Sequence, residues 1–323
     1  MWLLAEHQVL TTGQIASVEF SSRRRAQDRL ARLRSLGVLF AFRDSYMFGG
    51  TSEARYALGY SGARLIAAAR AVTPPTAKAH MQRLERLAFL PTLTHQLGVN
   101  GFFCGLAAHS NPTRTGGGVG RLTQWWPERR SAEFFWTNHG TDGREARVRP
   151  DGYGCWESDG RAVRFFLEYD TGTESLRVLA HKITAYSAFY TDRFGVLLFS
   201  LHSVRREQEF RAGLVKFLGG HDPGVVIATT ARDLPGADDP SGQVWGLWSG
   251  RDHGPLTRLT LANLPERGPR VRHHAPELPY GEAAFAPTDP ATVSLLSAAA
   301  SAPPPREPVW WDSPSGLTPR RSA

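Results

Sequence analysis

Apolar residues recur at helical spacing through the first seventy residues of the chain. In the segment 23–36, Ala26, Leu30, Leu33 and Leu36 follow this spacing and Gly37 ends the pattern. Further helices are predicted at 2–9, after the threonines at 11–12, and at 61–70, and serines at 21–22 cap the helix at 23–36. Short strands at 38–42 and 55–58 flank a polar, glycine-containing loop. Three helices followed by a hairpin predict a winged helix-turn-helix over residues 1–73.

The pattern changes after the proline pair at 74–75, which predicts a domain boundary. Residues 76–110 are expected to be largely helical, and 111–120 form a glycine-rich loop without the Gly-Lys-Ser/Thr ending of a phosphate loop. Beyond it, strands are predicted at 122–126, 134–136, 146–156, 161–170, 195–200 and 225–229, with helices at 173–190 and 204–218. This order predicts an α/β domain with a mixed sheet over residues 76–230.

The remaining residues show little periodicity. We expect residues 231–265 to form a C-terminal extension. Residues 266–323 are rich in Pro, Ala and Ser, a composition typical of a disordered tail.

The positive charge of the chain is concentrated at its N-terminal end. Of the net charge of +8, residues 1–90 carry +7, from 13 Arg and Lys against 6 Asp and Glu. A basic module joined to a nearly neutral body indicates a polyanionic partner for the first part. The alternative is a basic face that contacts only solvent.

Within the basic module, the helix predicted at 23–36 carries most of the arginines. They are Arg23, Arg24, Arg25, Arg29, Arg32 and Arg34. An apolar stripe opposite a cationic face is what a helix needs to lie in the major groove of double-stranded DNA. The alternative is an amphipathic core helix whose arginines are solvated.

Composition excludes several other classes of protein. No run of about 18 apolar residues is present, so no transmembrane helix is predicted. No signal peptide is recognised, and Cys104 and Cys155 are too few for a disulfide framework or a closed zinc site. We therefore expect a cytoplasmic protein without a membrane partner.

An acidic pattern marks the strands predicted at 146–156 and 161–170. Asp159-Gly160 between two β-rich runs is a hairpin signal. If these two residues form the loop, Ser158 faces Arg161 and Asp151 faces Glu168. A four-residue loop would instead place Asp151 opposite Phe166.

In the first register, three carboxylates share one face of the sheet, those of Asp151, Glu168 and Asp170. Like charges that face each other destabilise a sheet, and a bound Mg²⁺ or Mn²⁺ would relieve the repulsion. Phe165, Leu167 and Tyr169 then lie on the opposite face. The alternative is that Pro150-Asp151-Gly152 is an ordinary turn and that the acidic residues are merely exposed.

Several segments resemble the replication-relaxation family of bacterial plasmids and other mobile elements. They are Leu-Thr-Thr-Gly-Gln-Ile at 10–15, Arg-Leu-Ala-Arg-Leu-Arg-Ser-Leu-Gly at 29–37, Trp-Pro-Glu at 126–128, Arg-Pro-Asp-Gly-Tyr at 149–153, Phe-Leu-Glu-Tyr-Asp-Thr-Gly-Thr-Glu-Ser-Leu at 166–176, and Lys182-Ile183 with Tyr186 and Tyr190. The resemblance covers residues 3–230 through the order and spacing of these segments.

The resemblance implies a winged helix joined to a domain similar to restriction-endonuclease-like nucleases. In such nucleases, an Asp on one strand and a Glu-x-Lys on the next bind Mg²⁺ and activate water. Carried over to this chain, Asp151 and Glu168 would be metal ligands. The lysine position is occupied by Asp170, so this sequence departs from the pattern.

Lys182, on the following helix, is the candidate replacement for the missing lysine. A lysine there would stabilise the attacking hydroxide or the charge of the transition state. The alternative is a surface lysine. Tyr186 and Tyr190 are candidate nucleophiles for a covalent nick, although their spacing favours core aromatics.

Two functions follow from these observations. One is a DNA-binding protein with metal-dependent nicking or relaxing activity, in which Asp151, Glu168, Asp170 and Lys182 are catalytic. The other is an inactive relative that regulates or assists replication or transfer, alone or with plasmid replication or transfer proteins. Asp170 in place of lysine favours the second function, and the convergence of carboxylates favours the first. A transcription regulator with an unrelated sensor domain is a third, weaker interpretation.

Overall fold

The computed structural model describes residues 1–44, 50–111, 113, 120–137, 148–188, 191, 194–250 and 256–267. The chain divides into two compact units, one of residues 1–117 and one that begins at residue 118. Most of the tail predicted at 266–323 lies outside the described residues. None of the described helices is both long and apolar enough to cross a membrane.

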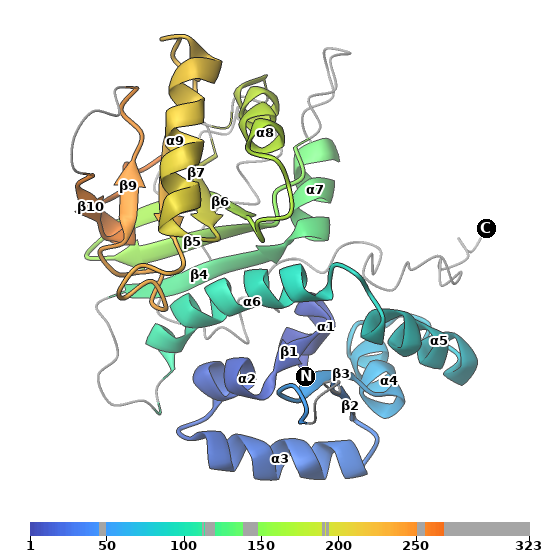
Figure 1. Cartoon of the computed structure of the whole chain (residues 1–323). Helices are drawn as coiled ribbons and strands as arrows, with labels where there is room; N and C mark the ends of the chain where they lie inside the picture. Colours follow the sequence, from blue (N-terminus) through green and yellow to red (C-terminus); the bar gives the residue numbers. More distant parts are fainter. Residues whose placement is uncertain are drawn as a thin grey trace. The chain divides into compact units, whose positions relative to one another are not determined.

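The first unit combines helices with a three-stranded sheet (Figure 1). Its elements are α1 (Trp2–His7), β1 (Leu10–Thr11), α2 (Thr12–Glu19), α3 (Arg23–Ser35), β2 (Leu39–Phe42), β3 (Arg55–Leu58), α4 (Tyr60–Ala69), α5 (Ala77–Ala88), α6 (Leu93–Ala107) and the 3₁₀ turn η1 (Ala108–Ser110).

Capping side chains fix where the two helices before the hairpin begin. Thr11 and Gln14 form a capping box at α2: the Thr11 hydroxyl accepts from the Gln14 amide at 3.2 Å, and the Gln14 side chain accepts from the Thr11 amide at 2.9 Å. Ser22 accepts from the amide of Arg25 at the start of α3. Gly37 has a φ of 67°, which ends α3 before β2 begins.

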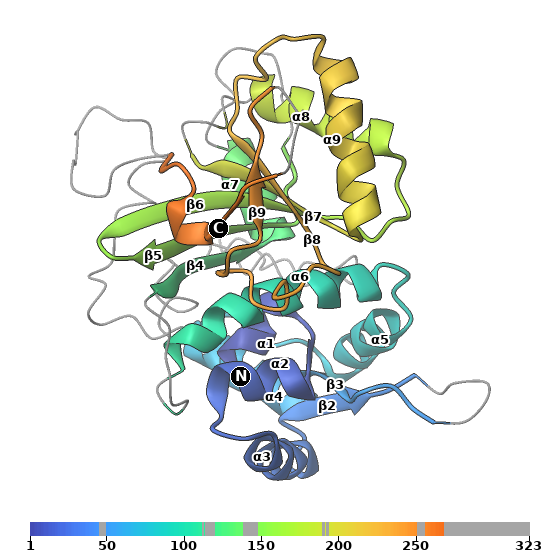
Figure 2. The ribbon, with the colours of Figure 1, turned by 60° about the vertical axis from the view of Figure 1, so that its left-hand side comes forward.

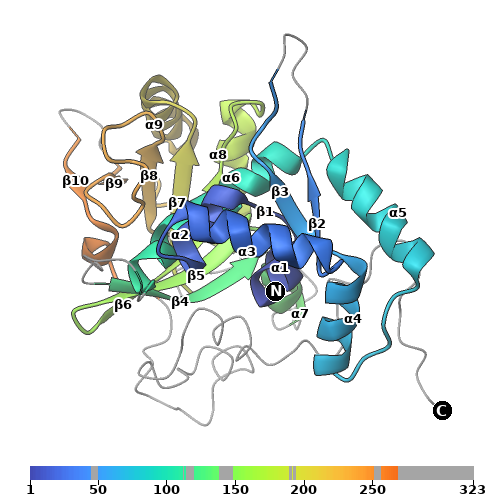
Figure 3. The same cartoon turned by 90° about the horizontal axis from the view of Figure 1, so that it is seen from below.

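The predicted order of helices and hairpin is present in the first unit. β2 and β3 pair antiparallel, with Leu39 opposite Leu58 and Phe42 opposite Arg55. The strand β1, whose two residues are too few for the sequence pattern to reveal, pairs with the other side of β3. Figure 3 shows α3 beside this small sheet.

The first unit extends beyond the boundary expected at residues 72–75, because α5 and α6 pack onto it. Leu84, Leu87 and Leu93 share a core with Val9 and Ala57. Two buried polar contacts attach these helices to β3 and to the residue before β1: His80 Nε2 lies 3.0 Å from the carbonyl of Leu58, and Asn100 donates to the carbonyl of Val9 at 2.7 Å. The second of these contacts joins residues 91 positions apart.

The second unit is a mixed sheet covered by helices. Its elements are β4 (Gly120–Pro127), α7 (Glu128–Thr137), β5 (Gly152–Ser158), β6 (Arg161–Tyr169), α8 (Leu176–Ala188), β7 (Val196–Leu201), α9 (Val204–Leu218), β8 (Ile227–Ala231), β9 (Trp245–Leu247), β10 (Arg258–Leu259) and the 3₁₀ turn η3 (Leu261–Asn263).

The seven described strands follow the order β10-β9-β8-β7-β6-β5-β4. β6, β7 and β8 run parallel, and the other neighbouring pairs are antiparallel. α7, α8 and α9 supply Phe135, Ile183 and Phe210 to one core, which they share with Phe166 and Phe199 of the sheet (Figure 1). The predicted α/β class and mixed sheet are therefore confirmed.

The strand predicted at 134–136 is wrong, because this segment belongs to helix α7. Its run of aromatic residues has strand propensity, but Glu128 lies in the first turn of a helix that follows directly on β4. Phe135 is only 2% exposed and packs against Tyr153 and Phe166 of the sheet. Tertiary packing thus overrides the local propensity.

The segment after β8 adds two strands to the sheet instead of ending it. β9 pairs with β8 (Figure 2), and β10 pairs with β9. Arg258 of β10 forms a two-pronged ion pair with the buried Glu207 of α9, with N–O distances of 2.8 and 2.7 Å. These strands are only two and three residues long, too short for the sequence pattern to reveal.

Candidate functional site

The β5–β6 hairpin has the register that the Asp-Gly signal predicts. Asp159 and Gly160 have φ values of 51° and 76°, as a two-residue turn with both central residues left-handed requires. Ser158 pairs with Arg161, and the ladder continues to Gly152 opposite Leu167. The ladder ends there, one position before Asp151 and Glu168, and its register excludes the four-residue loop.

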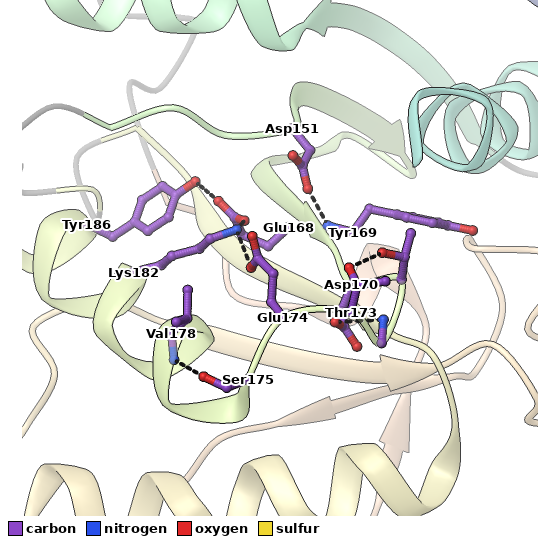
Figure 4. Close-up of polar contacts among 12 residues, drawn as sticks. Asp151, Glu168, Tyr169, Asp170, Thr173, Glu174, Ser175, Val178, Lys182 and Tyr186 are labelled. Atoms are coloured by element: carbon purple, nitrogen blue, oxygen red, sulfur yellow. Dashed lines mark hydrogen bonds and ion pairs between the residues drawn. The ribbon is translucent and has the colours of Figure 1, made fainter. Parts of the chain in front are cut away.

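Asp151 lies at the end of the β5–β6 hairpin opposite the turn and is hydrogen-bonded to β6. Its amide donates to the carbonyl of Leu167 at 3.0 Å, and its carboxylate Oδ2 accepts from the amide of Tyr169 at 2.7 Å (Figure 4). A side-chain oxygen thus replaces the carbonyl that a continuing ladder would supply. The side chain of Asp151 is only partly buried, so this carboxylate has both a structural partner and access to solvent.

Glu168 is a deeply buried carboxylate of the candidate site. Its side chain is 2% exposed, and each oxygen accepts one hydrogen bond, from Lys182 Nζ at 2.8 Å and from the Tyr186 hydroxyl at 2.5 Å (Figure 4). Burial and then the charge of Asp151 raise the pKa of Glu168 to about 7, against the opposing effects of Lys182 and Tyr186. Asp151 is therefore close enough to act on Glu168 electrostatically.

Lys182 belongs to this cluster and does not simply extend into solvent. It lies in α8 and contacts Glu168 at 2.8 Å and Glu174 at 3.2 Å. Burial lowers the pKa of Lys182, but the carboxylates of Glu168, Asp151 and Glu174 outweigh it and raise the pKa above its usual range. One third of the side chain remains exposed, so an approaching anion would meet a charged ammonium.

Asp170 does not join the other two carboxylates, and the predicted patch of three is wrong. β6 ends at Tyr169, and Asp170 accepts from both Nε and Nη2 of Arg206 and from the amide of Gly172 at 3.0 Å. Although burial opposes it, Arg206 and Gly172 lower the pKa of Asp170. Among the described residues, no three His, Cys, Asp or Glu side chains are placed to hold a metal ion.

Tyr186 is a core residue, as its spacing in α8 favours. It is 2% exposed, and its ring packs against Phe166. Burial and the charge of Glu168 raise its pKa well above the ordinary value, so the hydroxyl is held as a neutral donor. This environment does not favour a tyrosinate nucleophile. Tyr190 lies outside the described residues.

Helix α3 places its arginines on an exposed face. Ala26 and Leu30 are buried, at 0% and 3% exposure, and anchor the opposite face, whereas Leu36 at the C-terminal end is 61% exposed. The exposed arginines are the six that the sequence predicts, Arg23, Arg24, Arg25, Arg29, Arg32 and Arg34.

These arginines differ in their partners. Arg23 pairs with Glu53 at 2.6 Å and Arg24 with Asp28 at 3.4 Å. Arg25 donates to the Ser21 hydroxyl at 3.1 Å. For the other three, Arg29, Arg32 and Arg34, the described part of the chain offers no side-chain hydrogen bond or ion pair. Their guanidinium groups keep their full capacity for an external anion.

Sequence reasoning missed the polar partners that come from distant elements. Arg206 of α9 is 36 residues from Asp170, and Glu53 is 30 residues from Arg23. The side-chain cap of α9, Ser203, is visible in the sequence, but nothing in the sequence indicates that Arg206 faces Asp170.

Comparison with known proteins agrees with these features. The family model described as replication-relaxation matches residues 1–195, more than half of the chain. No curated protein and no solved structure was found to match it. The match includes the arginine helix α3, the β5–β6 hairpin and the helix that carries Lys182. The chain therefore belongs to the replication-relaxation family.

Proposed function

We propose that this protein binds double-stranded DNA in the replication or relaxation of a plasmid or other mobile element. The first unit acts as a winged helix-turn-helix, and α3 is the helix that reads DNA. The observation that carries the proposal is the exposed face of α3, where Arg29, Arg32 and Arg34 have no partner in the described part of the chain.

Physical chemistry supports a nucleic acid as the partner of this face. Unpaired guanidinium groups on one helix repel each other, and the DNA backbone supplies the closely spaced negative charges that neutralise them. Guanidinium also matches the two acceptors on the guanine edge in the major groove. The buried Ala26 and Leu30 hold the helix against its own unit, so that its arginine face stays outward.

A binding assay with matched variants tests this proposal. We expect the full chain to bind a fluorescent DNA duplex, and the triple variant Arg29→Gln, Arg32→Gln, Arg34→Gln to bind at least about tenfold more weakly. The control is Arg205→Gln, which removes an exposed arginine of α9 that pairs with Glu209. Equal loss in both variants, or no loss in the triple variant, would contradict the role of α3.

Metal-dependent nicking is a second candidate function, supported by the ion pair of Glu168 with Lys182 and by the nearby charge of Asp151. Mg²⁺ is commonly held by one or two carboxylates together with water and substrate phosphates, so the donor set of Asp151 and Glu168 fits its chemistry. When bound, the ion would polarise a phosphate and lower the pKa of water. Lys182 would contribute a positive charge near the phosphate that is attacked.

Conversion of supercoiled plasmid to open circles in the presence of Mg²⁺ or Mn²⁺ tests the nicking candidate. We expect Asp151→Asn and Glu168→Gln to abolish nicking and to leave DNA binding intact. Glu157→Gln, on the same hairpin and paired with Arg121, is the control and should nick normally. If the wild-type protein binds DNA without producing open circles, the second unit has an accessory role in binding DNA or partner proteins.

A further inference from the structure

Glu53 links the first residues of both helices of the proposed DNA-binding motif. It lies just before β3, and its Oε1 accepts from the amide of Gly13 at 2.8 Å and from Nη2 of Arg23 at 2.6 Å. Gly13 is the second residue of α2, and Arg23 is the first residue of α3. One carboxylate oxygen is therefore shared by the N-terminal ends of two successive helices.

The two donors that hold Glu53 are also suited to a DNA phosphate. The first amides of a helix are partially positive and lack partners within the helix, so they bind anions. Arg23 adds a full positive charge beside the Gly13 amide. A surface hollow next to them, lined by residues of α2, the turn and α3, including Ala16, Ser17 and Ser22, leaves this side of the motif open.

The carboxylate of Glu53 lies close against the glycine at position 13. A Cβ atom there would lie 3.2 Å from Glu53 Oε1, closer than most real contacts. The carboxylate is about one third exposed and the arginine 61% exposed, so the pair lies at the surface where it can open. Arg29, Arg32 and Arg34 on the same helix have no comparable carboxylate in the described part of the chain.

We infer that Glu53 is an internal competitor of DNA: it occupies the Gly13 amide and Arg23 and thereby weakens binding of the phosphate backbone. The inference rests on the proposed DNA-binding function. A phosphate that approaches these donors meets a carboxylate of like charge, and must displace it or lose both contacts. Glu53 thus lowers affinity for DNA of any sequence, because phosphate contacts do not depend on sequence. Contacts with the bases then contribute a larger share of the binding free energy.

Removal of the Glu53 charge tests the inference. We expect Glu53→Gln and Glu53→Ala each to tighten binding of the full chain to a random-sequence duplex several-fold. The slope of log K against log salt should steepen by about 0.9, the value for one additional phosphate contact. In the Arg23→Gln background, the same changes should have a much smaller effect, because the main donor is gone. Thermal melting should show that the variants are folded.

Asp28→Asn is the matched control for a general effect of charge. Asp28 is also a carboxylate beside an α3 arginine, at 3.4 Å from Arg24, but α2 provides it with no amide. An equal gain from Asp28→Asn would overturn the inference, as would Glu53 variants that bind no tighter than wild type. Failure of the proposed function gives a different result, because the wild-type protein would then not bind DNA at all.

Discussion

At the scale of single residues, Glu168 shows how the candidate site is held together. Its carboxyl group is buried, and two side chains of α8 donate to it, Lys182 and Tyr186. Removal of either donor would leave a buried acceptor without a partner, which costs more than a hydrogen bond contributes. The side chains of Glu168, Lys182 and Tyr186 can therefore contribute both to the stability of the fold and to the chemistry of the site. The contribution of Glu168 to stability depends on pH and can be measured by itself.

The pH dependence of stability should carry the signature of Glu168. Burial raises its pKa from 4.5 to about 7, so between these values the folded state holds a proton that the unfolded chain releases. The contribution of Glu168 to the free energy of unfolding is thus fully present below pH 4.5. As pH rises towards 7, about 2–3 kcal/mol of it is lost.

Urea unfolding of the wild type and of Glu168→Gln across this range measures the contribution. The variant has no titrating group at this position, so the free energy of unfolding of the wild type should fall relative to that of the variant as pH rises. A difference that stays constant from pH 4.5 to 7, or that changes in the opposite direction, would show that Glu168 is ionised throughout.

Part of the site follows from the sequence because its determinants are local. The Asp159-Gly160 turn sets the hairpin register as far as Gly152 opposite Leu167, so Asp151 and Glu168 are the residues that follow at the end of the ladder. The departure of Asp170 does not follow, because it depends on Arg206 from a helix 36 residues further along the chain. The arginine face of α3 likewise follows from the local sequence, whereas the pairing of Arg23 with Glu53 joins residues 30 positions apart.

At the scale of elements, helices with strong apolar spacing and caps are predicted closely. The helix predicted at 204–218 matches α9, and the start predicted for α3 is correct. The errors lie in segments whose secondary structure is determined by tertiary packing. Residues 134–136 have strand propensity but form part of α7, and the short strands β9 and β10 exist only because β8 offers a free edge.

Substitution of two glycines by alanine tests these local rules, because the two changes in stability should have opposite signs. Gly160 has a φ of 76° in the hairpin turn, so Gly160→Ala should destabilise the protein by about 1–2 kcal/mol. Gly213 lies inside α9, where an added methyl group meets nothing within 4 Å, so Gly213→Ala should stabilise by about 0.5–1 kcal/mol.

Chemical denaturation of both variants at one pH measures these changes. Equal effects from the two substitutions would contradict the left-handed turn geometry that sets the register of the β5–β6 hairpin.

At the scale of the whole molecule, most of the positive charge lies within the part of the chain that the family match covers. Residues 1–90 carry +7 of the net +8, and the family match extends from residue 1 to residue 195. The described α/β unit brings together carboxylates and a lysine, whereas the first unit presents the unpaired arginines. Attraction to DNA by charge is therefore expected to reside mainly in the first unit.

The central claim, that the arginine face of α3 contacts the DNA backbone, is tested most directly by the salt dependence of binding. The affinity of the full chain for a duplex is measured between about 50 and 200 mM salt. In the variant Arg29→Gln, Arg32→Gln, Arg34→Gln, the slope of log K against log salt should become shallower by about 2–3, close to 0.9 for each lost contact. Arg205→Gln should leave the slope unchanged. A triple variant with the wild-type slope would contradict the account.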